Sequence, residues 1–269
     1  MGAGMKLRTI SVIMPCLNEE KNIDLAIQAT LNALDRYEIL GELIVVNDGS
    51  TDQTGNKMNK WIKRNQRVRL LEHESPQGIG VSFWHGVQEA KNAFITMFPG
   101  DNENNPEETL TYFNLTENVD VVIPFIHNIE VRSKWRRLIS SLYRFMINLS
   151  FGTNLNYTNG TVIYNNTLLK ELRHHATGFF YQTEILVRLI RAGYLYAEVP
   201  HFLQSRSYGK TKALSLYSFW NVTKGYLRLM WDIHIVRKFG RADSRIHEDS
   251  ATYRRRCKSI DSIYENIQT

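Results

Sequence analysis

Short apolar runs that end in polar turns alternate with helical segments along the first half of this chain. The runs are residues 9–14, 43–46, 68–71, 93–98 and 119–124. Buried strands of this length that alternate with helices predict βαβ units, which form a largely parallel sheet covered by helices on both faces. We therefore expect an α/β fold in which ligands bind at the carboxyl ends of the strands.

The length and composition suit one α/β domain with a C-terminal extension. The chain has 269 residues, of which 43% are hydrophobic and 22% are charged, as in an ordinary globular protein. We expect the domain at residues 1–236, with a first half at 9–124 and a second half at 125–236. Residues 237–269 are expected to form a basic, partly disordered tail.

Neither the charge nor the hydropathy of the chain points to nucleic acid or to a membrane-spanning helix. The net charge of +6 suits an anionic substrate or an anionic membrane surface, and no long basic stripe occurs in the first half. The longest apolar candidate, residues 138–151, is interrupted by Arg144 and Asn148 and is shorter than the about 20 residues that a span needs. No signal peptide opens the chain, so we expect a cytoplasmic protein.

The loops at the strand ends carry polar groups suited to a nucleotide diphosphate. These loops are residues 15–20, 47–52 and 99–107. Their acidic character suits an anionic ligand only if a divalent cation lies between them, and the carboxylates of Asp101 and Glu103 suit Mg²⁺ or Mn²⁺. Residues two apart in a loop can direct both side chains to one side. The alternative is that Asp101 caps a turn, while Glu103 is solvated near the start of a helix at Pro106.

Together with later segments, these loops resemble glycosyltransferase family 2, whose members have the GT-A fold. The motifs are residues 15–20, 47–52, 78–80, 101–107, 178–184, 193–194, 198–200 and 206–212, of which the last, R-S-Y-G-K-T-K, is similar to the family's R-x-Y-G-E-S-K. Any one motif is weak, but the ordered set is specific and covers roughly residues 9–230. Within the family, the chain resembles dolichol- and polyprenyl-phosphate mannosyl- and glucosyltransferases.

The resemblance implies an inverting glycosyltransferase that moves a sugar from a GDP- or UDP-sugar to a lipid-linked or other membrane-proximal acceptor, with Mg²⁺ or Mn²⁺ as cofactor. The first half of the domain is then the nucleotide-sugar-binding half, and the second half binds the acceptor. Two alternatives stay open: a soluble transferase that extends a glycan, and a catalytically silent nucleotide-sugar-binding module that partners another transferase. A dehydrogenase is disfavoured, because no G-x-G-x-x-G follows the first strand.

The resemblance also implies roles for individual residues. The expected donor-binding residues are Pro15, Leu17, Glu19, Asn47, Asp48, Gly78 and Gly100, and the expected metal ligands are Asp101 and Glu103. Asp101, Glu184, Arg206 and Lys212 are expected to be catalytic. The two cations would offset charge on the leaving group, and Glu184 would be the base if the acceptor is a hydroxyl. The alternatives are a buried structural role for Glu184 and a surface ion pair for Arg206.

Several positions of the expected donor and acceptor sites depart from the family's pattern. Pro99 replaces the first aspartate of the metal loop, and Glu103 replaces a glutamine, which restores a negative charge. Ile79 replaces a lysine near the base or phosphate. Ser141 and Val162 replace two arginines that bind the acceptor phosphate in the family. We expect the acceptor to be bound instead by Arg136, Arg137 and Arg144.

Two segments of the second half, residues 133–151 and 214–236, are expected to be amphipathic helices. In the first, the apolar residues on one face are Trp135, Leu138, Ile139, Leu142, Phe145, Met146 and Leu149, whereas the lysine and arginines lie elsewhere. Such helices can lie in a membrane interface beside a lipid acceptor, which predicts a peripheral contact with the cytoplasmic face of a membrane. The alternative is that both stripes pack against the sheet as core.

Overall fold

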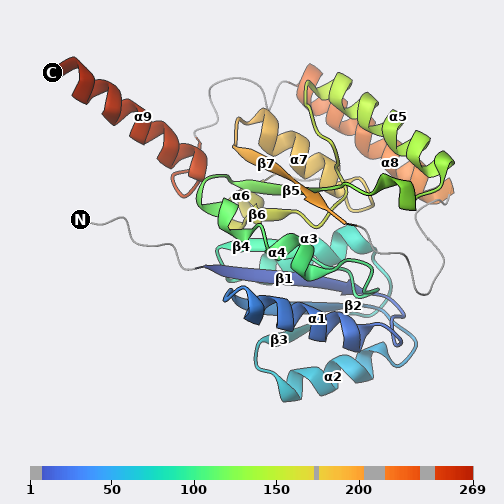
Figure 1. The fold of residues 1–269 in the computed structure, drawn as a ribbon. Coiled ribbons are helices and arrows are strands. Elements are labelled where there is room, and N and C mark those ends of the chain that lie inside the picture. Colours follow the sequence, from blue (N-terminus) through green and yellow to red (C-terminus); the bar gives the residue numbers. More distant parts are fainter. Residues whose placement is uncertain (1–7, 173–175, 203–215, 237–245, 269) are drawn as a thin grey trace.

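A computed structural model describes residues 8–172, 176–202, 216–236 and 246–268. Its centre is a seven-stranded sheet with the strand order β3-β2-β1-β4-β6-β5-β7 (Figure 1). The strands are β1 (Thr9–Cys16), β2 (Leu40–Asp48), β3 (Val68–His73), β4 (Phe94–Met97), β5 (Val121–Ile126), β6 (Ile163–Asn165) and β7 (Tyr196–His201). Strand β6 runs antiparallel to its neighbours β4 and β5, and all other pairs are parallel.

Helices connect the strands and continue beyond the last one. The α-helices are α1 (Ile23–Arg36), α2 (Thr54–Arg64), α3 (Ile79–Glu89), α4 (Pro106–Leu110), α5 (Lys134–Phe151), α6 (Asn166–Glu171), α7 (Tyr181–Arg191), α8 (Leu216–Met230) and α9 (Ala251–Gln268). Two 3₁₀-helices, η1 (Phe113–Glu117) and η2 (Ile129–Val131), flank β5, and a π-helical segment, η3 (Trp231–Ile235), continues α8. None of the described helices is both long enough and apolar enough to span a bilayer.

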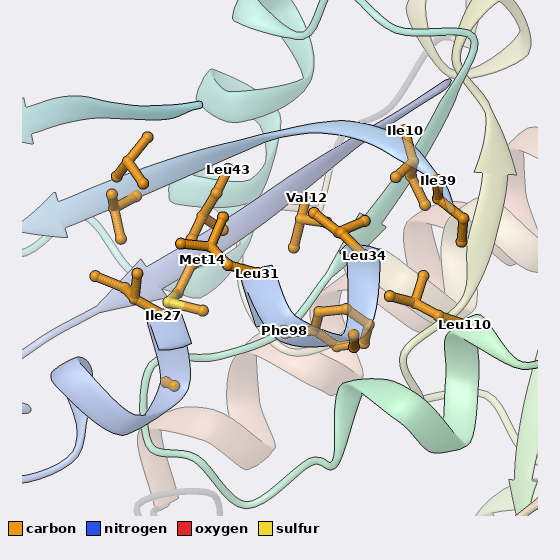
Figure 2. Close-up of a cluster of buried hydrophobic side chains, with 14 of the residues drawn as sticks. Ile10, Val12, Met14, Ile27, Leu31, Leu34, Ile39, Leu43, Phe98 and Leu110 are labelled. Atoms are coloured by element: carbon orange, nitrogen blue, oxygen red, sulfur yellow. The ribbon is translucent and has the colours of Figure 1, made fainter. Parts of the chain in front are cut away.

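Strand β1 contributes to a core on each face of the sheet, because successive side chains of a strand point to opposite faces. Ile10, Val12 and Met14 belong to a cluster with α1 and α4, as Figure 2 shows. Ile13 belongs to a second cluster on the other face, with α3, α6 and α7. The sheet is therefore buried on both sides, which is what the continuous apolar runs of the sequence predict.

The α/β fold with a largely parallel sheet is confirmed, and each of the five strands expected from the sequence is present within a few residues of its expected limits. Strands β6 and β7 were not expected. Strand β6 has three residues, so it is too short to show a pattern, and it pairs antiparallel between two longer strands. The expected helices at 133–151 and 214–236 are present as α5 and as α8 with η3.

Helix α9 is attached to the sheet through a buried aspartate. Asp120, 1% exposed just before β5, accepts hydrogen bonds from the N–H groups of Ala251 at 2.6 Å and Thr252 at 3.1 Å, and from the Thr252 hydroxyl. A carboxylate at a helix N-terminus satisfies unpaired N–H groups and interacts favourably with the helix dipole. The helix then extends away from the sheet (Figure 1). Within the expected tail, residues 251–268 form this helix.

Candidate active site

The parallel strands bring the polar loops of the sequence to one edge of the sheet. Strands β1, β2, β3 and β4 all run in the same direction, so the loops that follow Cys16, Asp48, His73 and Met97 start at the same edge. Strand β6 is antiparallel to both β4 and β5, so β5 runs in the same direction as β4. Strand β7 is parallel to β5, and both strands therefore also end at this edge. This edge is where ligands bind in open α/β sheets.

The loops after β1 and β2 are held together by hydrogen bonds between them. The Asn18 N–H donates to the Ser50 hydroxyl at 3.0 Å, and the Thr51 N–H donates to the Asn18 side chain at 2.8 Å. Asn18 has a φ of +58°, a left-handed conformation that asparagine tolerates better than most residues. The Glu19 N–H also donates to the Thr54 hydroxyl at 2.8 Å. The expected donor-binding positions Leu17 and Glu19 thus lie, half-buried, in a fixed loop.

Asp48 lies at the end of β2, and its carboxylate organises the next loop. Its Oδ1 accepts hydrogen bonds from the Gln77 N–H at 2.8 Å and lies 2.7 Å from His73 Nδ1, while its Oδ2 accepts from the Gly78 N–H at 2.9 Å. Burial raises the pKa of this carboxyl, but the hydrogen bonds from His73, Gln77 and Gly78 outweigh that effect and hold the pKa below its usual value. Asp48 is therefore a carboxylate that anchors the start of α3.

Two histidines extend this arrangement and were missed in the sequence. His73 Nε2 lies 3.0 Å from His85 Nδ1, and the two rings stack with centroids 5.2 Å apart. The β2–β3 register places His73 directly beside Asp48, so a correct strand alignment would have identified the first histidine. Asn47 is similarly engaged, because its Oδ1 accepts from the Ser50 N–H at 3.1 Å. Asn47 and Asp48 are both buried at the sheet edge.

Two glycines at this edge allow close packing that a side chain would prevent. A Cβ atom at Gly80 would come within 2.2 Å of the Thr177 carbonyl oxygen, and one at Gly100 would come within 2.4 Å of Cys16 Sγ. The Gly100 N–H donates to the Pro15 carbonyl at 3.1 Å. The expected donor-binding residues Pro15 and Gly100 are therefore neighbours, and the loop after β4 is fixed to the end of β1.

Asp101 and Glu103 lie in this loop, both half-buried. Asp101 Oδ1 accepts from the Glu103 N–H at 3.1 Å, so the turn cap that the sequence left open as an alternative is present. Burial, and then the charges of Glu19 and Asp101, raise the pKa of the Cys16 thiol, so carboxylates from the loops after β1 and β4 both act on this buried group. The loop ends at α4, where the Asn105 side chain accepts from the Glu107 N–H at 3.0 Å.

The carboxylate oxygens of this loop fit a hard divalent cation whose other ligands would come from a substrate and water. Among the described residues, no group of three or more His, Cys, Asp or Glu side chains surrounds a metal position. Mg²⁺ is commonly held by one or two carboxylates, with substrate phosphates and water completing its shell. Asp101 and Glu103 offer carboxylates in that number, two residues apart in one ordered loop.

Glu184 is buried in the second half of the domain and has the structural role that the sequence left open. Its Oε1 accepts from Arg188 Nε at 2.8 Å, and its Oε2 accepts from the Ala176 N–H at 2.7 Å. Arg188, 1% exposed, also pairs with Asp232 of η3 at 2.7 Å. Both carboxylate oxygens are engaged, so Glu184 holds the segment before α7 and is poorly placed to accept a proton from a substrate.

Of the remaining expected residues, the structure describes the three arginines of the second half. Arg136, Arg137 and Arg144 are on α5, and Arg144 Nη1 donates to the Asn156 carbonyl at 3.4 Å. Arg206 and Lys212 lie outside the described residues. The structure therefore brings together the donor and metal positions of the first half and places the three helix arginines in the second half.

The comparisons with known proteins agree with this geometry. Residues 11–177 match the model of glycosyl transferase family 2. The chain belongs to this family. The resemblance noted from the sequence motifs is therefore confirmed.

Two curated relatives act on lipid phosphates, as their names state. A dodecaprenyl-phosphate galacturonate synthase from Rhizobium johnstonii is 24% identical over 168 residues, which are 61% of this chain and 50% of that protein. A dolichyl-phosphate beta-glucosyltransferase from Trichomonas vaginalis is 29% identical over 114 residues, which are 40% of this chain and 34% of that protein. The chain thus spans half or less of the length of these relatives.

Solved structures with a similar fold include a synthase crystallised with several ligands. Glucosyl-3-phosphoglycerate synthase from Mycobacterium tuberculosis, in complex with Mn²⁺, UDP-glucose and phosphoglyceric acid, has a TM-score of 0.65 and 21% identity, and the match covers 83% of this chain and 80% of that one. The same synthase with Mg²⁺ and UDP has a TM-score of 0.66. These likenesses establish the GT-A fold of the chain.

Asp48→Asn is expected to lower the free energy of unfolding at neutral pH by about 1–3 kcal/mol, because hydrogen bonds to a charged group are lost. The folded pKa of Asp48 is lowered, so its stabilisation is present above the unfolded value near 3.9 and is lost as the pH falls through the folded value. The difference between wild type and variant should therefore shrink below about pH 4. Urea unfolding at neutral pH and at about pH 3 measures both quantities.

Glu74→Gln provides the control, because Glu74 is exposed on the neighbouring loop and its substitution should change stability by less than about 0.5 kcal/mol. A stability difference for Asp48→Asn that is the same at both pH values would contradict the assignment of Asp48 as an ionised anchor.

Proposed function

We propose that the chain transfers a sugar, with inversion at the anomeric carbon, from a GDP- or UDP-sugar to a lipid-linked acceptor of the polyprenyl-phosphate kind at a membrane surface. The observation that carries this proposal is an extensive apolar face on the acceptor half that is exposed to solvent. It is supported by the lipid-phosphate acceptors named for two curated relatives.

The apolar face extends over α5, α8 and η3, which is the opposite of the core packing that the sequence left open for these helices. On α5 the exposed fractions include 76% for Trp135, 66% for Phe145 and 72% for Leu149. On α8 and η3 they are 68% for Trp220 and 60% for Trp231. The remaining large apolar side chains that are exposed on these helices are Leu138, Ile139, Leu142, Met146, Leu227 and Ile235.

Helices α5 and α8 lie side by side (Figure 1), and we infer that their exposed apolar side chains form one surface. The Ser150 and Tyr226 hydroxyls lie 2.7 Å apart, and Ile147, Phe151 and Leu229 share a small core beneath the helices. An exposed apolar patch of this kind on a domain marks an interaction site. Aromatic and aliphatic residues next to arginines on the same helix are typical of a helix that lies in a membrane interface.

The donor would bind at the loops after β1, β2 and β4, where Asp48 orders the start of α3 and the Gly100 N–H fixes the β4 loop to the end of β1. Asp101 and Glu103 would hold the Mg²⁺ or Mn²⁺, which when bound neutralises the diphosphate and makes it a better leaving group. Arg206 and Lys212 would donate to the same diphosphate or to the acceptor. An acceptor phosphate is already ionised, so no general base is required, which agrees with the engagement of Glu184.

A soluble acceptor is the second candidate. It is favoured by the structural likeness to a synthase crystallised with phosphoglyceric acid. In that case the apolar face would contact another protein surface. Membrane binding separates the two candidates.

Asp101→Ala is expected to lower kcat/KM for sugar transfer at least about 100-fold, because one of the two proposed metal ligands is lost. The assay supplies labelled UDP- and GDP-sugars, Mg²⁺ or Mn²⁺, and polyprenyl phosphate in detergent. Glu117→Gln, an exposed carboxylate on η1, is the control and should retain full activity. Full activity of Asp101→Ala, or no transfer from any common sugar nucleotide by the wild type, would contradict the proposal.

Wild-type protein is expected to float with phosphatidylcholine vesicles that contain about 30% phosphatidylglycerol. Replacing Leu142, Phe145 and Leu149 together by serine should reduce the bound fraction at least about tenfold, because each apolar side chain that enters the interface contributes about 1.5–3 kcal/mol. Leu25→Ser on α1 is the matched control, since Leu25 is 61% exposed and lies outside the apolar face. Wild-type protein that stays in the aqueous fraction would favour the soluble acceptor.

A further inference from the structure

Among the described residues, Arg132 has no acidic partner, and it lies beyond the end of β5, at the edge of the sheet where the parallel strands end. Arg132 follows η2 directly after β5, and its Nη2 donates to the Tyr157 hydroxyl at 3.1 Å. Its guanidinium carbon lies 5.6 Å from the centroid of the Tyr157 ring. Its Nε is buried and has no hydrogen-bond partner among the described residues, and none of their carboxylates forms an ion pair with it.

The loop that carries Tyr157 is fixed to three elements around the catalytic edge. The Gly160 carbonyl accepts from Gln182 Nε2 of α7 at 2.8 Å, and a Cβ atom on Gly160 would come within 2.9 Å of the Pro124 carbonyl oxygen of β5. The Thr161 hydroxyl lies 2.5 Å from the hydroxyl of Thr109 on α4, the helix that follows the Asp101 loop. Arg132 is therefore held against a loop that also contacts α4, the helix that follows the proposed metal loop.

A second arginine reaches the same loop. Arg144 Nη1 donates to the carbonyl of Asn156, the residue before Tyr157. Glu198 contacts the same loop. Its carboxylate accepts from the Asn156 N–H at 2.7 Å and from the Asn156 side-chain amide at 2.8 Å. The carboxylate thereby fixes Asn156. Two guanidinium groups thus converge on Asn156 and Tyr157.

The sequence lacks arginines at the two positions where the resemblance led us to expect them for an acceptor phosphate. Ser141, at one family arginine position, is an exposed residue of α5, and Val162, at the other, is 1% exposed in the sheet core. Neither can bind a phosphate by charge. Arg132 returns a cation to the loop that precedes Val162, and it lies three residues before Trp135, where the apolar face of α5 begins.

We propose that Arg132, with Arg144 beside it, binds the phosphate group of the acceptor. The inference rests on the proposed function, since it names how that acceptor is held. Guanidinium groups donate paired hydrogen bonds to phosphate oxygens, and a guanidinium fixed by an aromatic ring loses little freedom when it does so. The phosphate is the headgroup of a lipid whose chain lies along α5, or it belongs to a soluble acceptor.

The test measures phosphate binding by the full chain without a sugar donor, so it does not depend on transfer. The probes are undecaprenyl phosphate in phosphatidylcholine vesicles, undecaprenol in the same vesicles, and 3-phosphoglycerate in solution. Arg132→Gln should weaken binding of at least one phosphate probe about tenfold or more, because a hydrogen bond between charged groups is lost. Arg132→Lys should recover part of the affinity, and Tyr157→Phe should weaken it less than Arg132→Gln.

Arg64→Gln is the matched control, because Arg64 is exposed at the C-terminal end of α2. This variant should bind every probe as the wild type does. Loss confined to the undecaprenyl phosphate vesicles supports a lipid source of the phosphate, and loss confined to 3-phosphoglycerate supports a soluble one. The inference is overturned if Arg132→Gln binds both phosphates like the wild type, if undecaprenol vesicles lose as much, or if the wild type binds neither phosphate. If Arg132→Gln transfers sugar and binds phosphate like the wild type, this inference fails but the proposed function stands.

Discussion

The parallel register of the strands is the constraint on which the rest of the structure depends. Because β1, β2 and β4 run side by side in one direction, their acidic loops meet at one edge, although they are far apart in the sequence. The loops are then fixed by local contacts, of which the Asp48 carboxylate makes three. Acidic loops that start at one edge repel one another, so this edge suits a ligand that brings a cation.

The sequence predicted the first half of the fold well, since its strands are buried on both faces and read as continuous apolar runs. It also predicted which loops form the edge. It could not predict His73 and His85, because their contact with Asp48 depends on strand register and on the position of α3. Nor could it predict that Asp120 anchors α9, since 131 residues separate Asp120 from Ala251.

Residues 125–236 show what hydrophobic periodicity along a sequence cannot predict. An apolar stripe on α5 has the same pattern whether it faces a core or a membrane, and only the structure shows that Trp135 and Leu149 are exposed. The buried ion pairs of Arg188 with Glu184 and Asp232 join α7 to η3, so the helices of the apolar face are fastened to the domain by charge as well as by packing. Removal of one partner from such a group is costly.

The proposed function depends most on Asp101 and Glu103, which would hold a divalent cation at the diphosphate of the donor. Electron paramagnetic resonance of Mn²⁺ tests it directly, through the hyperfine coupling of the metal to the ³¹P nuclei of bound UDP or GDP. We predict a protein-bound Mn²⁺ signal with ³¹P coupling in the wild type, and its loss when Asp101 and Glu103 are both replaced by alanine. An unchanged coupled signal in the double variant would contradict the claim.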